Sequence, residues 1–214
     1  MLEWLARVAS GCVTHSPIWA DRLRSACAGP VEVIPLCYPD LEISSPRPIG
    51  DVLTISTVGH TNPNNRADHV IRALASDAEL SERCRYQLLG EIEDAERQRL
   101  SNLAEELNVP SPKFLGRLSE HDLRTALTET DVIACLRHPV LEGGSASLIT
   151  AVLTGRPTLV SHQAHYAEIP EGLVLPCHPG NEAPDVAKQL RWILDNKDHA
   201  RTLGMRARQY ALAV

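Results

Sequence analysis

The sequence contains no long hydrophobic segment, no excess of basic charge and no paired cysteine motif. Its apolar runs fall short of the roughly 18 residues that cross a membrane. The N-terminal MLEWLARVASG carries Glu3 and Arg7, which indicates an amphipathic helix and not a signal peptide. The formal net charge of -6 argues against nucleic acid as a partner, because such binding requires cations opposite the phosphates. Contact with a membrane surface has no support in the sequence.

Six cysteines are spread along the chain, and none forms a C-x-x-C pair. Because they lie mostly in apolar runs such as VIACL, we expect buried free thiols in a reducing compartment, and therefore a cytoplasmic protein. We expect no metal site, since His162, His165 and His178 lack the carboxylate–histidine spacing of metalloenzymes. The sequence also has no Walker-type loop and no Ser–His–Asp arrangement.

Short apolar runs alternate with segments of helical period through most of the 214 residues. The runs are rich in Val, Ile and Leu, which is typical of parallel strands buried on both faces. Strands are predicted in GCVTH, VEVIP, VLTISTVG, YQLLGE, PKFLG, DVIACL, PTLVS and GLVLP. Helices are predicted at 17–28, 68–75, 94–107, 119–127 with Ser119 as N-cap, 145–153 with Gly155 as C-cap, 185–196 and 200–213. This alternation predicts an α/β fold with a Rossmann-like, doubly wound parallel sheet, whose ligand lies at the carboxyl ends of the strands.

One boundary is visible in PDLEISSPRPIG at 39–50, where three prolines and two serines without periodicity predict a linker. Residues 1–38 contain only a short helix–strand fragment, which is too small for its own core and should dock on something larger. Residues 51–214 contain a full α/β domain. We interpret the fragment as the end of a preceding domain or as an interdomain segment.

The loop after VLTISTVG reads GHTNPNNR and opens a helix. Gly59 lets a ligand approach the backbone closely, and Arg66 together with a helix N-terminus suits an anion such as a diphosphate. A polar turn with a solvated arginine is the alternative interpretation of this loop.

The loop after DVIACL reads RHPVLEGGSASLI and also opens a helix. Gly143, Gly144 and Ser145 leave backbone N–H groups free for phosphate oxygens, and Glu142 beside them can accept hydrogen bonds from sugar hydroxyls. A glycine-rich turn capped by Ser145 is the alternative.

The order of these motifs, from FLGRLSEHDL to SHQAHYAEIP, resembles the donor-binding domain of family 4 glycosyltransferases. GHTNPNNRADHVIRAL is similar to that family's Gly-rich loop and helix, and CVTHSPIWADRLR and VEVIPLCYP resemble the passage from its first domain to its second. The resemblance implies half of a GT-B fold, in a retaining enzyme that moves a sugar from a nucleotide diphosphate donor to a sugar or glycan acceptor. It implies no cofactor or metal. The acceptor would bind mainly to a first domain, missing here through truncation or separate encoding, or to another chain.

The resemblance carries over to individual residues only in part. Glu142 matches the first Glu of the family's E-x7-E motif, which contacts the donor sugar, whereas Thr150 stands at the second. The family's diphosphate-binding Lys corresponds to Asn65, with Arg66 adjacent, and Arg137 is a further cation. Arg117 follows PKFLG, where related enzymes approach the base. The predicted catalytic residues are Glu142 and Arg66, and the predicted donor-binding residues are Gly59, His60, Asn65, Arg66, Arg117, Leu118, Glu142, Gly143, Gly144, Ser145 and Thr150.

Two other hypotheses stay open. Asn65 and Thr150 favour a degenerate, noncatalytic module that keeps the fold for binding or assembly. Another GT-B enzyme, such as a nucleotide-sugar epimerase, would share the architecture. His15 and Glu168 are possible cleft residues, while Trp19 is expected to be a packing residue.

Overall fold

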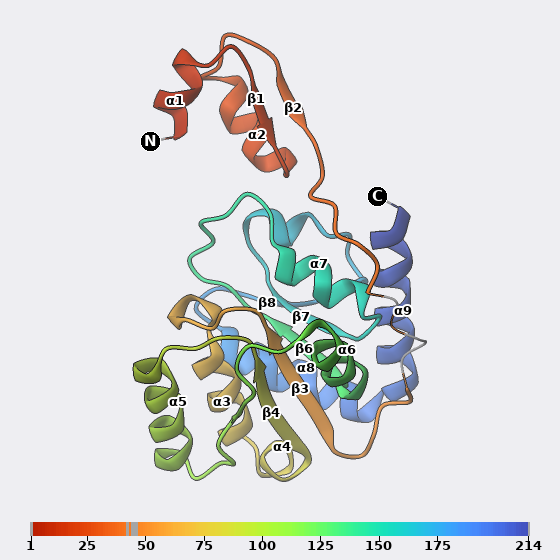
Figure 1. Cartoon of the computed structure of the whole chain (residues 1–214). Coiled ribbons are helices and arrows are strands. Elements are labelled where there is room, and N and C mark those ends of the chain that lie inside the picture. The colour runs from red at the N-terminus through yellow and green to blue at the C-terminus, as the bar shows by residue number, and fades with distance from the viewer. Residues whose placement is uncertain (1, 42, 44–46, 214) are drawn as a thin grey trace.

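The computed structural model describes residues 2–41, 43 and 47–213. Its main body contains a six-stranded parallel sheet in the order β5-β4-β3-β6-β7-β8 (Figure 1). The strands are β3 (Leu53–Val58), β4 (Cys84–Leu89), β5 (Lys113–Phe114), β6 (Val132–Cys135), β7 (Thr158–Ser161) and β8 (Leu175–Cys177). The order reverses direction at β3, since β4 and β5 lie on one side of it and β6 to β8 on the other. The predicted α/β fold with a doubly wound parallel sheet is confirmed.

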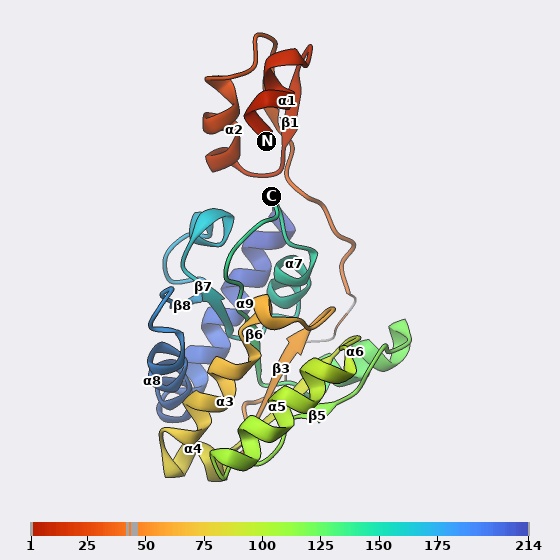
Figure 2. The ribbon, with the colours of Figure 1, turned by 90° about the vertical axis from the view of Figure 1, so that its left-hand side faces the viewer.

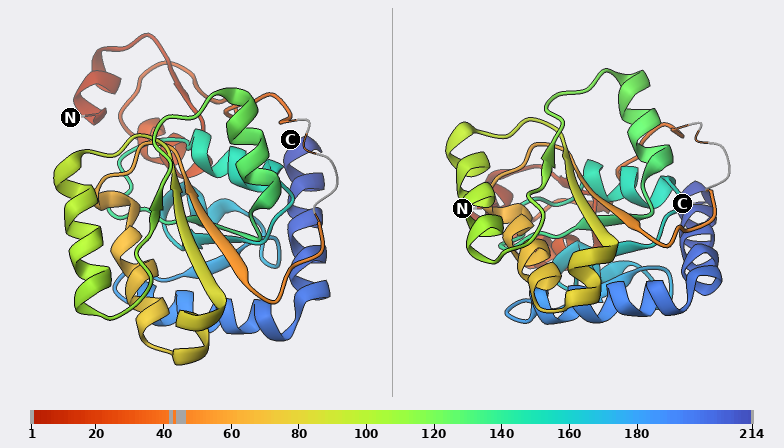
Figure 3. Two further views of the ribbon diagram at one scale, coloured as in Figure 1. Left: turned by 60° about the horizontal axis from the view of Figure 1, so that its bottom comes forward. Right: turned by 90° about the horizontal axis from the view of Figure 1, so that it is seen from below.

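The sheet is covered by helices on both faces (Figures 2 and 3), as its uninterrupted apolar strands require. The helices are α3 (Ala67–Ala75), α4 (Ala78–Arg83), α5 (Asp94–Glu106), α6 (Glu120–Glu129), α7 (Ala146–Leu153), α8 (Glu182–Asp195) and α9 (Lys197–Ala213). One core cluster joins the sheet to α3, α4, α5 and α8 through residues such as Leu74, Leu100 and Leu190. The other joins it to α6, α7 and the end of α9 through Leu127 and Ala151.

Helix ends follow the capping chemistry that the sequence predicts. Ser119 Oγ accepts a hydrogen bond from the N–H of Asp122 at 3.1 Å and caps α6. Ser145 Oγ accepts from the N–H of Leu148 at 3.2 Å and caps α7. Gly155, which follows Thr154 at the end of α7, has a φ of 71°, the left-handed conformation that favours glycine at this position.

Residues 2–33 form a separate small unit, the N-terminal unit, at the top of Figure 1. It contains α1 (Leu2–Val8), β1 (Cys12–Thr14), α2 (Pro17–Arg24) and β2 (Val31–Val33). The strands β1 and β2 pair in parallel as a two-stranded sheet. An extended chain leads from β2 to the main body (Figure 2).

The segment 39–50, predicted as a linker, packs on the main body at several of its described positions. Ile43 and Ile49 are buried in the two core clusters. Arg47 donates to the carbonyl of Glu129 and to Asp131 Oδ2 at 2.7 and 3.0 Å. Residues 42 and 44–46 of the segment lie outside the described residues. The domain boundaries predicted from the sequence therefore stay a proposal.

The cysteines are free, but the expectation that all of them are buried is wrong. Cys84, Cys135 and Cys177 are buried in or beside strands of the large sheet. Cys12 and Cys27, in the N-terminal unit, are half-buried, and Cys37 is exposed. Cys12 and Cys27 are less buried because the N-terminal unit is too small to enclose all of its side chains, whereas Cys37 lies on the chain that follows this unit.

Candidate functional site

The two loops predicted to bind an anion meet at one edge of the sheet. They follow β3 and β6, which pair in parallel with Ile55 opposite Val132, so their carboxyl ends lie together. The loops are in direct contact, because the N–H of His138 donates to the carbonyl of Asn64 at 2.8 Å. Gly59, with a φ of 103°, lies so close to α7 that an added Cβ would be 2.7 Å from Ser147 Oγ. Glycine is needed at 59 for both reasons.

A cavity of about 860 Å³ opens at this edge between β3, β4, the start of α6 and α7. Gly59, His60, Arg117, Leu118 and Thr150, all predicted as donor-binding residues, line it together. Asp40 and Leu41, from the segment after the N-terminal unit, and Ala146 and Ser147, from α7, complete this wall. The volume is in the range of pockets for small molecules and cofactors.

A smaller cavity of about 350 Å³ lies against the same helix end. The predicted residues Glu142, Gly144 and Ser145 line it, together with Asn64 and Arg137. Ala146 and Ser147 line both cavities, so the first turn of α7 separates one cavity from the other. An extended ligand that occupied both cavities would therefore cross the free N–H groups of a helix N-terminus, where an anion is favoured.

Glu142 and Arg137 are the charged pair of the smaller cavity. Arg137 Nε lies 3.2 Å from Glu142 Oε1, and the hydroxyl of Tyr166 donates to the same oxygen at 3.2 Å. Tyr166 is 1% exposed, and burial raises its pKa, so it remains a hydrogen-bond donor at neutral pH. Glu142 Oε2 accepts from the N–H of Leu141 at 3.1 Å, so one cation and a carboxylate with a partner on each oxygen face the cavity.

Asn65 and Arg66, predicted to contact the diphosphate, turn away from this site. Among the described residues, neither lines either cavity. Asn65 is buried, and its Oδ1 accepts from the N–H of Asn62 at 2.9 Å, which closes the loop on itself. Arg66 has a φ of 53°, and its Nε lies 3.4 Å from Oε1 of the buried Glu182. Arg137 is the arginine that lines the smaller cavity.

The N-terminal unit reaches the same loop from outside the sheet. A Cβ added at Gly144 would lie 3.2 Å from Cβ of His15, and one added at Gly143 would lie 3.8 Å from Cδ1 of Trp19. His15 Nδ1 is 2.8 Å from the carbonyl oxygen of Ile34, which holds the ring at the end of β1. Trp19, expected to be a packing residue, therefore packs next to the loop that carries Gly143 and Gly144, a contact that helical spacing alone does not reveal.

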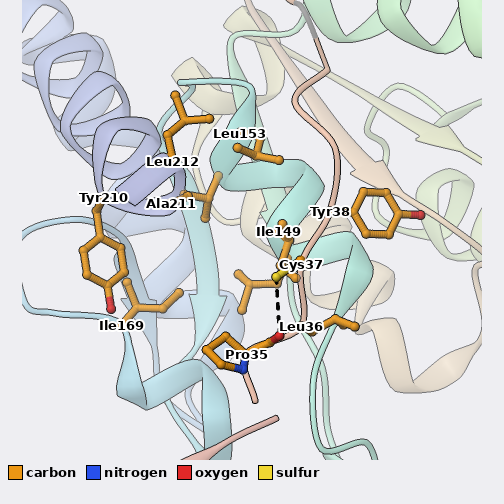
Figure 4. A pocket seen from close by; sticks show the side chains of 12 residues that line it. Pro35, Leu36, Cys37, Tyr38, Ile149, Leu153, Ile169, Tyr210, Ala211 and Leu212 are labelled. Carbon is orange, nitrogen blue, oxygen red and sulfur yellow. Dashed lines mark hydrogen bonds between the residues drawn. The ribbon is translucent and has the colours of Figure 1, made fainter. Parts of the chain in front are cut away.

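A third cavity, of about 340 Å³, is lined mainly by apolar side chains (Figure 4). It lies between the chain at Pro35 to Tyr38, another side of α7 and the end of α9. Within the described part of the chain, no cluster of His, Cys, Asp or Glu is suited to hold a metal ion. None of the described helices is both long enough and apolar enough for a membrane span.

Comparisons with known proteins agree with this architecture. The family model for glycosyl transferases group 1 matches residues 42–210. No curated protein matches the chain.

Among solved structures, sucrose-phosphate synthase from Thermosynechococcus elongatus superposes with a TM-score of 0.82 at 23% identity, over 99% of this chain and 56% of its own. HepE from Anabaena, solved in complex with UDP-glucose, superposes with a TM-score of 0.80 at 18% identity, over 97% of this chain and 60% of its own. The C-terminal domain of LpcC from Francisella tularensis superposes with a TM-score of 0.68 at 12% identity, over 82% of this chain and 97% of its own. This chain thus spans little more than half of the first two proteins. At these identities the likeness establishes the fold, that of the C-terminal half of GT-B glycosyltransferases.

Proposed function

Because the chain belongs to the glycosyl transferases of group 1, we propose that it binds a nucleotide diphosphate sugar and takes part in transfer of that sugar, with retention, to an acceptor. The acceptor, a sugar or glycan, binds mainly to a preceding domain or another chain that covers the N-terminal unit. Residues 51–214 are the donor-binding domain, 39–50 the connection, and 1–38 the end of the preceding domain.

The observation that carries this proposal is the pair of cavities divided by the first turn of α7. The larger cavity takes the nucleoside beside Arg117 and Thr150, and the smaller takes the sugar beside Glu142. The diphosphate then lies across the N-terminus of α7, where N–H groups and Arg137 face its charge. HepE, which shares the fold, was solved with UDP-glucose, and we propose a uridine nucleotide as the donor here.

Arg137 and Glu142 change partners in this proposal. In the ligand-free protein they pair with each other at 3.2 Å. When the donor binds, the phosphate attracts the guanidinium, and Glu142 becomes free to accept hydrogen bonds from sugar hydroxyls, with Tyr166 still donating to it. Stabilisation of the departing diphosphate by Arg137 and the helix N-terminus is the contribution to transfer.

A noncatalytic donor-binding module is the second candidate function. Thr150 lines the larger cavity at the position where the resemblance expects a carboxylate, and its hydroxyl cannot accept from both ribose hydroxyls as a carboxylate does. This function predicts nucleotide binding without transfer in the presence of the partner domain.

Calorimetric titration of the chain with UDP and UDP-glucose tests the proposal. Arg137→Ala should weaken binding of both ligands about ten- to a hundredfold, the equivalent of one charge-assisted hydrogen bond. Glu142→Gln should weaken UDP-glucose binding more than UDP binding, since its partner is the sugar. Arg66→Ala is the rival variant: if it weakens binding more than Arg137→Ala while the protein remains folded, Arg66 is the diphosphate cation.

Arg72→Ala is the matched control, because Arg72 is an exposed arginine on α3, away from both cavities. Equal affinity of wild type and Arg137→Ala for both ligands would remove Arg137 from the site. No binding of either ligand to the wild-type chain would contradict the choice of a uridine donor, and a panel of other nucleoside diphosphates would then test donor binding itself.

A further inference from the structure

A carboxylate from the main body caps a helix of the N-terminal unit. Glu168 is the last residue of the short 3-10 helix η2 (Ala164–Glu168), which follows β7. Its Oε1 accepts two hydrogen bonds, from Oγ of Ser16 and from the N–H of Ile18, each at 2.8 Å. Both donors lie at the start of α2.

The beginning of α2 needs such a partner. Pro17 at its first position has no N–H, so the N–H of Ile18 is the first that a cap must satisfy. Ser16, at the N-cap position, donates its hydroxyl to Glu168, and Ser16 is only 1% exposed. Glu168 thereby does for α2 what an N-cap side chain does for most helices, and its negative charge faces the positive end of the helix dipole.

The same contact sets where the N-terminal unit meets the EGGS loop, residues 142–145. Ser16 lies between His15 and α2, and α2 carries Trp19. The His15 side chain packs against Gly144, and the Trp19 side chain packs against Gly143, at the distances given above. The N-terminal unit thus closes one side of the loop that holds Glu142, and Glu168 is the polar contact that fixes it there.

We propose that Glu168 is a positioning residue for the donor site: it anchors α2 to the main body, and through His15 and Trp19 it holds the EGGS loop in place. This role rests on the proposed function in one respect, namely that the EGGS loop is the sugar side of the site. Glu168 itself stays away from the donor, because it lines neither cavity among the described residues.

Hydrogen exchange of the ligand-free, full chain tests the anchor independently of nucleotide binding. In Glu168→Ala, the amide of Ile18 should exchange roughly two- to thirtyfold faster, the range expected for loss of a helix cap. The amides of residues 142–145 should also exchange faster, while those of β3 and β6 keep their wild-type rates. Glu168→Gln should restore most of the protection, since its amide oxygen can accept the same two hydrogen bonds.

Glu171→Ala is the matched control, because Glu171 is an exposed glutamate three residues further along the same connection. Wild-type exchange at Ile18 in Glu168→Ala would overturn the anchor, as would loss of protection throughout the sheet, which would indicate general destabilisation. Faster exchange at Ile18 with unchanged exchange at 142–145 would overturn the link to the loop.

A second measurement addresses the donor site. Titration with UDP and UDP-glucose should show that Glu168→Ala loses affinity for UDP-glucose about two- to tenfold more than for UDP, within the range expected when one positioned hydrogen bond is weakened. Equal losses for the two ligands would overturn the role in holding the sugar side. If the wild-type chain bound neither ligand, the choice of a uridine donor would fail while the exchange result would still decide the anchor.

Discussion

The six cysteines differ sharply in solvent exposure and therefore in expected reactivity. Burial raises the pKa of the Cys84 and Cys135 thiols to about 12, and it raises that of Cys177 as well. Cys37 lies exposed on the chain that leaves the N-terminal unit. Because the thiolate is the reactive form, burial both hides the first three and keeps them protonated.

Thiol modification should therefore separate the cysteines into two classes. With a disulfide reagent such as DTNB at about pH 8, Cys37 should react first in the native protein, followed by Cys12 and Cys27. Cys84, Cys135 and Cys177 should react only when the protein unfolds, since all three are buried. Mass spectrometry of the modified peptides identifies the sites. Fast modification of Cys135 under native conditions would contradict the burial of β6.

Several residues predicted for the proposed donor site line the two cavities, whereas the directions of the side chains were not predictable from the sequence. Gly59, Glu142 and Thr150 line cavities where the motif spacing placed them. Arg66 has the expected charge, but the left-handed backbone at its position turns it toward Glu182. The left-handed backbone at Arg66 follows the closed turn at residues 62–65. The sequence Asn-Pro-Asn-Asn predicts that a turn forms there, but not the backbone conformation of the residue after it. The sequence marked Arg137 only as a further cation. Its place beside Glu142 and Tyr166 in the structure is what distinguishes it from the other arginines as a ligand-binding candidate.

At the scale of elements, a buried charge cluster connects α3 to α8. Glu182, the first residue of α8, is 0% exposed, and its Oε2 accepts from the N–H of Gly180 at 2.8 Å. Arg66 and His69, before and within α3, lie 3.4 and 3.8 Å from its carboxylate. Burial alone would raise the pKa of Glu182, but the backbone N–H groups and these two side chains outweigh burial and lower it below the usual 4.5.

The lowered pKa gives a pH-dependent stability. A carboxylate whose pKa is lower in the folded than in the unfolded chain stabilises the fold above the unfolded value, here 4.5, and this contribution is lost as pH falls through the folded pKa. Glu182→Gln should lower the free energy of unfolding by roughly 1–3 kcal/mol at pH 7. Urea denaturation at pH 7 and at about pH 3 should show the difference from wild type shrinking at the lower pH. The control is Glu105→Gln, at an exposed position of α5, and an equal loss in that variant would contradict the role of the cluster.

Elements were the most predictable level of this molecule. Each strand of the large sheet overlaps an apolar run that the sequence predicted, because parallel strands buried on both faces need such runs. The strand β4 begins two residues before YQLLGE, and β8 ends one residue after GLVLP. No pattern in the sequence indicated α4, AELSER, which has six residues and only Leu80 buried. The helix α8 begins at Glu182, earlier than predicted, because Pro184 is tolerated in a first helical turn although it resembles a break.

At the scale of the whole molecule, the N-terminal unit leaves large apolar side chains exposed. Val13 in β1 is 59% exposed, Ile34 directly after β2 is 54% exposed, and Trp4 on α1 is 67% exposed. Parallel sheets are normally covered on both faces, so these side chains fit beneath further secondary structure, as the proposed preceding domain would supply. Sequence composition showed that this unit is too small for a core, but its contact through Glu168 joins residues some 150 positions apart, which no local pattern encodes.

Limited proteolysis should reveal the boundary between the two units. We expect a protease of low specificity, such as subtilisin, to cut first at residues 34–38, where Ile34 and Tyr38 are exposed by 54% and 47% outside any helix or strand. Trypsin should spare Arg47, because its guanidinium is held by the carbonyl of Glu129 and by Asp131. The C-terminal product should keep its melting temperature within a few degrees, since both large core clusters lie entirely in that part of the chain. Mass spectrometry and thermal unfolding measure the two outcomes. A first tryptic cut at Arg47 would contradict the packing of that side chain on the main body, and cooperative loss of the large sheet once residues 34–38 are cleaved would show that the two units fold as one.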